Sequence, residues 1–342
     1  MHIIIILFFI ISFQITAGQI ISPCNASPTF VLKGDTLQIQ YKRDHTTAID
    51  SIVLSGPFQR YKLSIIDSIV QEIVWDSLTM ANYNIKLFSI VPQNTPSDLY
   101  DLLIYAGDDS DTSYKTVRVL STFPRTYSFI HLTDAHISRE WGNGYALELQ
   151  YTSRLVKLIN ILGVEFVVNT GDLIMEYSND NGFGRSGSVD IIWSNFFNGA
   201  GGYDGFRKMN VPQFLVPGNH DYRSNYTKPV GWNIYCGYRN YSFCYGDSRF
   251  LAFDGELGTD YPTKQLEASK EWLKENGSGV FRTLLIHNRT NRNTPFCDSN
   301  KINLALMGHT HANAIYSNGK TPTRELVTAS AGHFGQVGTA NV

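Results

Sequence analysis

The first third of the chain alternates apolar and polar residues over short runs, with a change of phase every eight to twelve residues. The runs are rich in Ile, Val, Tyr and Leu, and they read TLQIQYKR, AIDSIVLSG, YKLSII, QEIVW, YNIKLFSIV, DLLIYAG and YKTVRVLS. Gly, Pro, Asn or Asp separates them, and this spacing is typical of short strands that bury one face. The pattern therefore predicts an antiparallel β-sandwich domain over residues 24–122.

The pattern changes at Phe123-Pro124-Arg125, after which continuous apolar runs alternate with stretches at helical spacing. The segments that predict strands are SFIHLTD, EFVVNTGD, VPQFLVPGNHD, the hairpin YSFCYGDSRFLAFD, FRTLLIHN and INLALMGHTH. The stretches ALELQYTSRLVKLINILG and QLEASKEWLKEN have the apolar period of helices. Strands that alternate with helices predict a layered α/β domain over residues 126–342.

Residues 3–15 form an almost unbroken apolar run that ends at the small residues Thr16-Ala17-Gly18. This run is too short for a comfortable membrane span and has the length of a signal-peptide core. Residues 1–18 are therefore predicted to be a signal peptide, and an uncleaved N-terminal anchor is the alternative. Either interpretation places the rest of the chain outside the cytoplasm, and we expect no membrane span beyond this segment.

The composition limits the classes of function. Hydrophobic residues make up 43% of the 342 residues and charged residues 17%, which is ample material for a buried core. Lys and Arg total 28 against 30 Asp and Glu, a net charge of -2. This balance argues against a protein that coats nucleic acid through a basic surface. It is compatible with a small phosphorylated substrate, because metal ions can supply local positive charge.

The chain has four cysteines, at Cys24, Cys236, Cys244 and Cys297. In an exported protein an even number permits disulfides. A hairpin around the short aromatic segment between Cys236 and Cys244 could bring these two together, whereas we do not expect Cys24 and Cys297 to pair. Buried free thiols are the alternative. None of the cysteine spacings is that of a zinc site.

Polar side chains that can bind metals follow most of the predicted strands of the second domain. They are Asp134 and His136, Asp172, Asn219-His220-Asp221, His287, and His309 and His311. Ligand sites in layered α/β folds lie beyond the carboxyl ends of the strands, so we expect these side chains to meet. Alternation along an extended segment would turn Asp134 and His136 to one side, and His309 and His311 likewise, so that each pair grips one cation.

The residue types and their glycines narrow the chemistry. Carboxylate and imidazole ligands favour Fe, Mn, Zn or Co over Ca²⁺, which prefers oxygen alone. A glycine precedes Asp172, Asn219 and His309, and it would let the backbone turn sharply and approach a metal. Each fragment alone occurs by chance in many proteins. Five fragments in this order, each at a predicted strand end, are much harder to obtain by chance.

The fragments D-x-H, GD, GNHD, a single H and GHTH together resemble the signature of calcineurin-like metallophosphoesterases, from about Tyr127 to Ser330. The resemblance implies a four-layer α/β fold in which a β-sandwich is flanked by helices. It also implies two divalent or trivalent metal ions, such as Fe, Mn or Zn, at one edge of that sandwich. The all-β domain that precedes it is similar to immunoglobulin and fibronectin type III domains.

Carried over by position, the resemblance implies a role for each of the site residues. Asp134, His136 and His311 would hold the first metal, Asn219, His287 and His309 the second, and the carboxylate of Asp172 would bridge both. His220 and Asp221 would be catalytic rather than ligands. The implied activity is hydrolysis of a phosphomonoester or phosphodiester by a hydroxide that bridges the metals, with His220 as general acid, oriented by Asp221.

The chain departs from the relatives that this resemblance suggests in two places. Met175 stands where purple acid phosphatases have a tyrosine, so we expect no iron-tyrosinate colour. The segment between His287 and Gly308 is short, and we expect it to lack the helix that is usual there. The segments 176–190 and 222–240 are expected to rim the pocket, and Trp232 is one of the aromatic residues that could stack on a base or sugar.

Two other functions stay open at this point. One is a 5′-nucleotidase-like enzyme, although such enzymes need a large C-terminal nucleoside-binding domain and none fits after His311. The other is a binding or adhesion protein that uses its N-terminal sandwich and carries a catalytically dead second domain. Retention of every ligand position argues against this second alternative, because decay normally removes some of them.

The sequons of the chain give a test of its compartment. Five asparagines have Ser or Thr two residues on, with no Pro between: Asn25, Asn225, Asn240, Asn276 and Asn288. A glycan on Asn288 would crowd the neighbouring His287, and glycosylation acceptors belong on open surface loops. We therefore expect a secreted bacterial protein, periplasmic or extracellular, whose intact mass shows no N-glycan. An active enzyme with a glycan on Asn288 would contradict both the compartment and the role of His287.

Overall fold

The computed structural model describes eleven ranges of the chain: residues 19–43, 48–76, 81–137, 145–175, 189–221, 230–255, 263–276, 281–288, 293–317, 323–328 and 330–331. The predicted signal peptide lies outside these ranges, as do residues 176–188 and 222–229 of the two segments expected to rim the pocket. Among the helices in the described ranges, none combines the length and the apolar character needed to cross a membrane.

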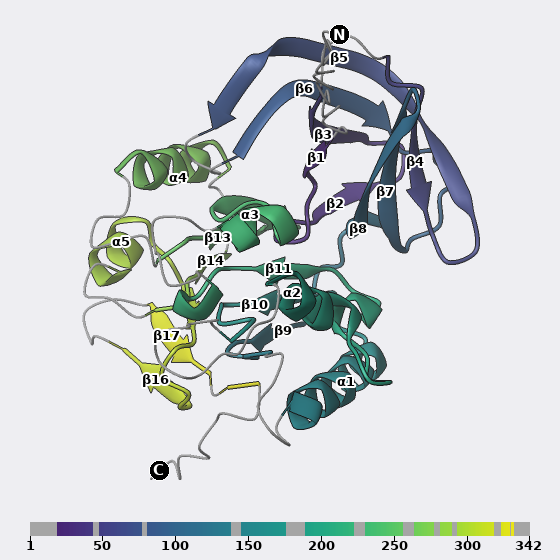
Figure 1. The fold of residues 1–342 in the computed structure, drawn as a ribbon. Helices are drawn as coiled ribbons and strands as arrows, with labels where there is room; N and C mark the ends of the chain where they lie inside the picture. Colours follow the sequence, from purple (N-terminus) through teal and green to yellow (C-terminus); the bar gives the residue numbers. More distant parts are fainter. Residues whose placement is uncertain are drawn as a thin grey trace, which may run out of the picture.

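The N-terminal strands form one eight-stranded sheet (Figure 1). The strands are β1 (Gln19–Ser22), β2 (Thr29–Leu32), β3 (Thr36–Lys42), β4 (Ser51–Ser55), β5 (Arg60–Asp76), β6 (Ala81–Ile90), β7 (Leu99–Ala106) and β8 (Asp109–Leu120). Their order is β1-β3-β6-β5-β4-β7-β8-β2, and only the pair β2 and β8 is parallel. Alternate residues such as Leu37, Ile39 and Tyr41 face a buried apolar core inside this sheet. The predicted all-β architecture is confirmed.

One strand of this sheet is longer than its sequence pattern predicts. The runs YKLSII and QEIVW, expected to be separate strands, are both parts of the 17-residue strand β5. Its pairing with β6 shifts register between Ile65 and Asp67 and again between Val70 and Val74. Such irregularities insert extra residues and reverse the faces to which side chains point, so a continuous strand changes phase and resembles two.

The second part of the chain contains two further sheets. A parallel sheet has the order β11 (Gln213–Leu215), β10 (Phe166–Asn169), β9 (Phe129–Leu132). A six-stranded sheet has the order β12 (Tyr241–Tyr245), β13 (Ser248–Ala252), β14 (Phe281–Leu285), β15 (Leu304–Met307), β17 (Arg324–Val327), β16 (Ala314–Tyr316). The helices are α1 (Tyr145–Leu162), α2 (Val189–Asn198), α3 (Val230–Tyr235), α4 (Thr263–Glu275) and α5 (Asn293–Ser299), with short 3-10 turns at Phe206–Lys208 and Asn219–Asp221.

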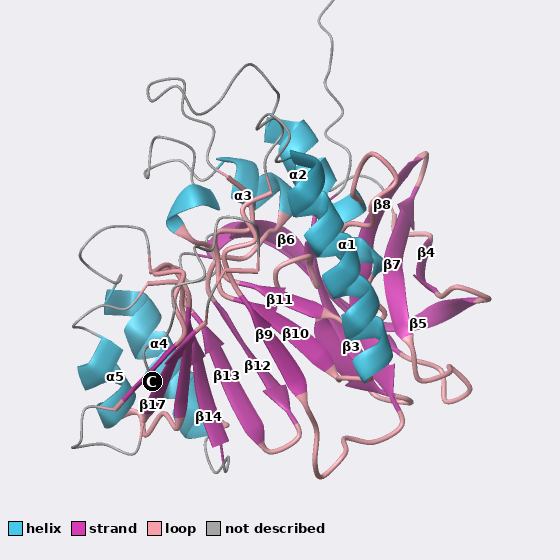
Figure 2. Cartoon of the chain, turned by 90° about the horizontal axis from the view of Figure 1, so that it is seen from below, coloured by secondary structure: helices cyan, strands magenta, loops and turns pink. Residues whose placement is uncertain are grey.

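The two sheets pack face to face through aromatic rings. The ring of Phe166 on β10 stacks on that of Phe129 at 5.2 Å and meets that of Phe250, on the other sheet, edge to face at 5.4 Å. Helices α1 and α2 lie on one side of this sandwich, and α4 and α5 lie on the other (Figure 2). The predicted four-layer α/β architecture is confirmed.

Helix α5 contradicts the expectation that the segment between His287 and Gly308 has no helix. The helix is only seven residues long, and its sequence NTPFCDS is rich in residues that usually mark loops. Pro295 lies in its first turn, where a missing backbone N–H costs no hydrogen bond. Phe296 and Cys297 pack beneath it against the outer face of the six-stranded sheet, and this packing stabilises a helix that has weak intrinsic propensity.

All four cysteines are free thiols in the structure, so the pairing of Cys236 with Cys244 is wrong. Cys236 is buried at the end of α3, whereas Cys244 lies on β12 and is half-buried. Burial raises the pKa of each of the two thiols, which keeps them protonated and unreactive.

A segment from the first domain completes the core of the second. The backbone of Ala26 accepts a hydrogen bond from Leu215 N, at the free edge of β11, and donates one to Cys236 O. The ring of Phe30 lies 5.7 Å from that of Phe166 and 4.7 Å from that of Tyr245. Residues 21–30 therefore belong to the same buried aromatic core as the two facing sheets.

This shared core can be tested by replacing Phe30 with Ala. The substitution removes a ring that contacts several others, and we expect it to lower the free energy of unfolding by about 3 kcal/mol. Urea unfolding followed by tryptophan fluorescence measures the change. The matched control is Phe58→Ala, because Phe58 is 97% exposed and its loss should change stability by less than about 0.5 kcal/mol. Equal stability of the two variants would show that the core is not shared.

Candidate metal centre

The candidate ligands converge from the carboxyl ends of five strands. Asp134 and His136 follow β9, Asp172 follows β10, and Asn219 follows β11. On the other sheet, His287 follows β14, and His309 and His311 follow β15. Parallel pairing aligns these strand ends along one edge of each sheet, and the facing of the sheets brings the two edges together. The structure thus assembles every candidate ligand that the sequence indicated.

Asp134, His136 and His311 form a first cluster. Oδ1 of Asp134 lies 3.1 Å from Nε2 of His311 and 3.6 Å from Nε2 of His136. The two Nε2 atoms are 2.9 Å apart. The other carboxylate oxygen of Asp134 accepts hydrogen bonds from Thr133 Oγ1 at 2.6 Å and from His309 N at 3.0 Å, which leaves Oδ1 directed at the imidazoles.

Asp172, His287 and His309 form a second cluster, with Asn219 beside it. Nε2 of His287 lies 3.2 Å from Oδ2 of Asp172, and Nδ1 of His309 lies 2.9 Å from Oδ1 of Asn219. Nδ1 of His287 is 2.7 Å from the carbonyl oxygen of Thr170. A proton on Nδ1 satisfies that contact and leaves the lone pair of Nε2 free for a metal, an arrangement usual behind metal-binding histidines.

Asp172 connects the two clusters. Its Oδ2 atom faces His287 of the second cluster at 3.2 Å and His136 of the first at 3.8 Å. Its Oδ1 atom accepts a hydrogen bond from His220 N at 2.8 Å, which fixes the plane of the carboxylate. One carboxylate between two ligand clusters is the arrangement that a pair of neighbouring cations requires.

The spacing of the donor atoms fits metal ions. Ligands at about 2.1 Å from an octahedral ion lie about 3.0 Å from one another, and those around a tetrahedral ion about 3.4 Å. The separations of 2.9 Å, 3.1 Å and 3.2 Å within the clusters match these values. The donor set of imidazole, carboxylate and amide oxygen suits Fe, Mn or Zn.

The backbone at the site is strained. Seven non-glycine residues of the described ranges have positive φ, and five of them are the candidate ligands Asp134 (55°), His136 (48°), Asp172 (51°), His309 (72°) and His311 (54°). Asp134 and His136 do share a cluster as expected, but the extended backbone expected to pair them is wrong, as is the pairing of His309 with His311. Left-handed turns aim each side chain separately, and His309 and His311 consequently join different clusters.

Three glycines provide the space that the ligands occupy. A Cβ atom on Gly171 would lie 2.7 Å from Nδ1 of His287, and one on Gly218 or Gly308 would overlap the carboxylate of Asp172 or Asp134. Gly171 also has a φ of +103°, a conformation that other residues rarely adopt. The predicted need for glycines beside the ligands is met by close packing at all three positions.

The electrostatic environment favours ionised carboxylates and, at His309, a neutral imidazole. Burial alone would raise the pKa of Asp134, but the side chains of His136 and His311 outweigh it and hold this pKa below its usual range. Burial also opposes ionisation of Asp172, and His287 contributes most to the net lowering of its pKa. The pKa of His309 is lowered chiefly by burial. These are the protonation states in which such residues bind cations.

His220 lies at the rim of the site, and its ring centroid is 4.9 Å from that of His136. Its Nε2 atom is 3.9 Å from Oδ2 of Asp172, close enough for His220 to form a potential ligand group with His136 and Asp172. Asp221 has a different task from the predicted one of orienting His220. Its carboxylate accepts hydrogen bonds from the backbone N–H groups of Leu173, Ile174 and Gly218 and thereby ties together the loops after β10 and β11.

Sequence reasoning missed several residues that support the ligands. Thr133 and Ser330 hold Asp134 from two sides, through Thr133 Oγ1 to its carboxylate and Ser330 Oγ to its carbonyl oxygen at 2.6 Å. The carbonyl group of Thr170 orients His287. Hydroxyl and carbonyl groups of this kind leave no spacing pattern, although both threonines directly precede motif residues. Trp232, for which stacking on a substrate and packing were both open, is fully buried and donates to Tyr238 O, so it packs in the core.

The fold and the two clusters of metal-binding side chains are typical of metal-dependent phosphoesterases. The family model for calcineurin-like phosphoesterases matches residues 127–313, and the chain belongs to this family. The matched residues include all nine site residues that the sequence indicated.

Several solved structures resemble the chain over part of its length. A dimetal phosphatase from Danio rerio has 11% identity and a TM-score of 0.42, over 59% of this chain and 87% of that one. GAP50, described as the anchor in the inner membrane complex of Plasmodium, has 16% identity and a TM-score of 0.38, over 59% of this chain and 71% of that one. Phosphopantetheinyl hydrolase from Mycobacterium tuberculosis has 11% identity and a TM-score of 0.35, over 59% of this chain and 89% of that one. No curated protein matches the chain.

Removal of the carboxylate between the clusters is expected to abolish metal binding. Asp172→Ala removes an anionic ligand from both clusters at once. The natural protein is expected to hold about two ions per chain, and the purified variant should lose them. Inductively coupled plasma mass spectrometry measures the content. Asp247→Ala is the control, since Asp247 is an exposed aspartate in the β12–β13 turn and should change nothing. Two retained ions in Asp172→Ala would contradict the placement of this residue.

Proposed function

We propose that the protein is a secreted dinuclear-metal hydrolase of phosphomonoesters or phosphodiesters. The observation that carries this proposal is the carboxylate of Asp172, buried between two ligand clusters in a chain of the calcineurin-like phosphoesterase family. The first metal would be held by Asp134, His136 and His311, and the second by Asn219, His287 and His309, with Asp172 shared. When bound, such a pair of ions supplies a water of lowered pKa and neutralises the phosphoryl oxygens.

The protein groups divide into a buried floor and an open side. Asp134, Asp172 and His287 are almost completely buried, with exposed fractions of 0%, 1% and 0%. Asn219, His220, His309 and His311 are partly exposed and form the side from which a substrate can approach. The floor fixes negative charge where cations are needed, and the open side leaves room for a phosphoryl group.

His220 is the group that we assign to proton transfer. Its side chain keeps 30% of its surface exposed and lies next to both clusters, while its backbone N–H is fixed on Asp172. Burial lowers the pKa of His220, and the neighbouring Asp172 opposes this by favouring the protonated ring. A protonated Nε2 at this rim can donate to the oxygen of a departing alcohol.

The alternative of a binding protein with a dead site is less well supported. Strained backbone conformations cost free energy and persist where function requires them. Five strained ligands in one site, together with glycines packed against them, favour a working metal centre over a relic. A 5′-nucleotidase-like activity stays within the proposed reaction class, and only substrate preference separates it.

The proposed bacterial source gains support from two of the sequons. Asn240 is 4% exposed and offers no open surface for a glycan. Asn288 is only partly exposed and directly follows the fully buried His287, which a glycan would crowd. This agrees with a bacterial exported protein that never meets a glycosylation pathway.

The activity is tested with a panel of phosphomonoesters and phosphodiesters, including nucleotides, assayed after addition of Mn²⁺, Fe²⁺ or Zn²⁺. We expect turnover of at least one ester class that disappears on chelation and returns with one of these metals. A protein that binds two metals and hydrolyses no ester in the panel would favour the binding-protein alternative.

Replacement of His220 separates its role from that of the ligands. His220→Ala should keep its metals and lose about 10²–10⁴-fold in kcat on phenyl phosphate, whose leaving group needs a proton. The loss on p-nitrophenyl phosphate should be much smaller, because that leaving group departs as an anion. The comparison of the two substrates within one variant is the internal control. Loss of metal from His220→Ala would show that this residue is a ligand instead.

A further inference from the structure

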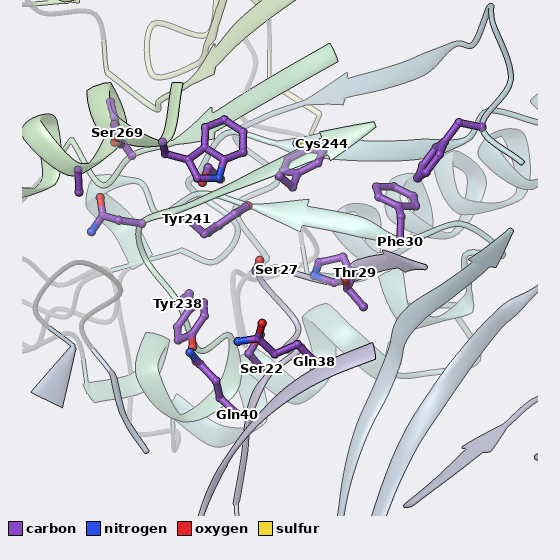
Figure 3. A pocket seen from close by; sticks show the side chains of 18 residues that line it. Ser22, Ser27, Thr29, Phe30, Gln38, Gln40, Tyr238, Tyr241, Cys244 and Ser269 are labelled. Carbon is purple, nitrogen blue, oxygen red and sulfur yellow. The ribbon is translucent and has the colours of Figure 1, made fainter. Parts of the chain in front are cut away.

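A cavity lies between the N-terminal segment of the chain and strand β12, and no candidate metal ligand lines it. Its volume is about 720 Å³, within the range of sites that hold a sizeable ligand. Strand β12 and helix α4 form one wall, and the N-terminal segment with β3 forms the other. Figure 3 shows Tyr241 and Cys244 on one side of the view and Gln38 and Gln40 on the other, with Ser27 and Thr29 between them.

The wall formed by β12 is a free strand edge. β12 is the terminal strand of its sheet and pairs only with β13. The cavity touches the four consecutive residues 241–244, whose side chains point alternately to opposite faces of the sheet, so it runs along the edge of the strand. The unpaired side of β12 therefore faces the cavity.

The register of the hairpin shows which backbone groups are available. Tyr245 pairs with Ser248 across a two-residue turn, which makes residues 241, 243 and 245 the positions that bond to β13. The N–H and C=O groups of Ser242 and Cys244 then point outward into the cavity. Among the residues that the structure describes, none forms a hydrogen bond to these outward groups.

On the opposite wall, polar side chains are spaced two residues apart, as the outward backbone groups of Ser242 and Cys244 are. Gln38 and Gln40 stand two residues apart on the outward face of β3, whose inward residues fill the core of the first sheet. Two residues of extended chain span about 6.7 Å, and this is also the repeat of the backbone groups along one edge of an extended peptide. Both walls thus offer hydrogen-bonding groups at the interval of a β-strand. The shorter repeat of a sugar chain does not match it.

Two amide groups of the cavity have hydrogen-bonding capacity to spare. Asn240 is 4% exposed, and its Oδ1 atom accepts a hydrogen bond from Asp254 N at 2.9 Å, but its buried Nδ2 atom has no partner in the described part of the protein. The buried Oε1 atom of Gln40 likewise has none. Buried amide groups normally form hydrogen bonds. A ligand with both an acceptor and a donor could bond to the Nδ2 atom of Asn240 and the Oε1 atom of Gln40.

The cavity is electrically neutral. None of its 18 lining residues is Asp, Glu, Lys or Arg, although such residues make up 17% of the chain. Phe30, Phe123 and Trp272 add apolar surface between the amides and hydroxyls. Edge strands are usually protected by a charge or a proline, and β12, with the sequence YSFCY, has neither. A charged ligand would lose its hydration here without gaining a counter-charge.

We propose that this cavity binds an extended, uncharged segment of a partner protein, which adds to the six-stranded sheet as a new strand beside β12. The backbone of the segment pairs with Ser242 and Cys244 on the side where Asn240 also lies, and its other edge meets Gln38 and Gln40. Main-chain hydrogen bonds supply affinity in this mode of recognition, and the aromatic residues select the side chains. The site is independent of the metal centre and does not rest on the proposed hydrolysis.

The test uses a library of capped octapeptides built only from uncharged residues, panned against the full chain. We expect enriched sequences that bind with micromolar affinity, as measured by isothermal titration calorimetry with single synthetic peptides. Ser242→Pro removes an outward N–H and leaves the β12–β13 hydrogen bonds intact, so it should weaken binding at least tenfold. Ser242→Ala keeps the N–H and should bind as the natural chain does.

A second variant guards against misfolding caused by proline. Gln40→Glu places a charge in the neutral cavity and should also weaken binding, while Gln40→Leu keeps the neutrality and should weaken it less. Metal content and the unfolding midpoint should stay unchanged in the glutamine variants. The proposal is overturned if no peptide is enriched, if Ser242→Pro and Gln40→Glu bind peptides normally, or if a panel of neutral oligosaccharides binds this cavity in preference to the peptides.

Discussion

The metal centre depends on hydrogen bonds between two stretches of main chain. The loops after β9 and β10 run side by side, and Asp134 N and His136 N donate to the carbonyl oxygens of Gly171 and Asp172 at 2.8 Å and 2.9 Å. These bonds hold three ligands in left-handed conformations that cost roughly 1–3 kcal/mol each. Five such ligands together cost an amount comparable with the whole stability of a typical domain, about 5–15 kcal/mol. Burial of the aromatic core beneath the loops must offset this cost, and bound cations would stabilise the strained ligands further.

The sequence predicts the layers and the ligand residues because both follow simple rules. Buried strands are apolar runs of fixed length, and ligands follow them at the ends of the strands. What the sequence does not show is the backbone conformation of the ligands, because left-handed turns at Asp134 and His311 are imposed by tertiary contacts. The same holds for α5, which tertiary packing stabilises, and for the bulges that made β5 resemble two strands. Asp221 accepts hydrogen bonds from backbone N–H groups instead of orienting His220. A motif indicates which residue is needed, but not which group that residue contacts.

The six-stranded sheet serves two distinct chemistries at two of its edges. The carboxyl ends of β14 and β15 carry His287, His309 and His311 into a site whose carboxylates and imidazoles suit cations. The lateral edge formed by β12 has no charge and offers only backbone and amide groups. Removal of a carboxylate or an imidazole is therefore expected to act at the first edge, and a change in backbone hydrogen bonding at the second. The two sites share no residue, so they can vary independently.

The hydrogen bond from Asn25 Nδ2 to Tyr235 O joins residues 210 positions apart. During synthesis at about 5–20 residues per second, the segment around Asn25 waits on the order of 10–40 s for this partner to be made. Ala26, whose carbonyl oxygen accepts the hydrogen bond at the edge of β11, therefore cannot complete its contacts until Cys236 has been made. Until then, the aromatic core that the two parts of the chain share stays incomplete.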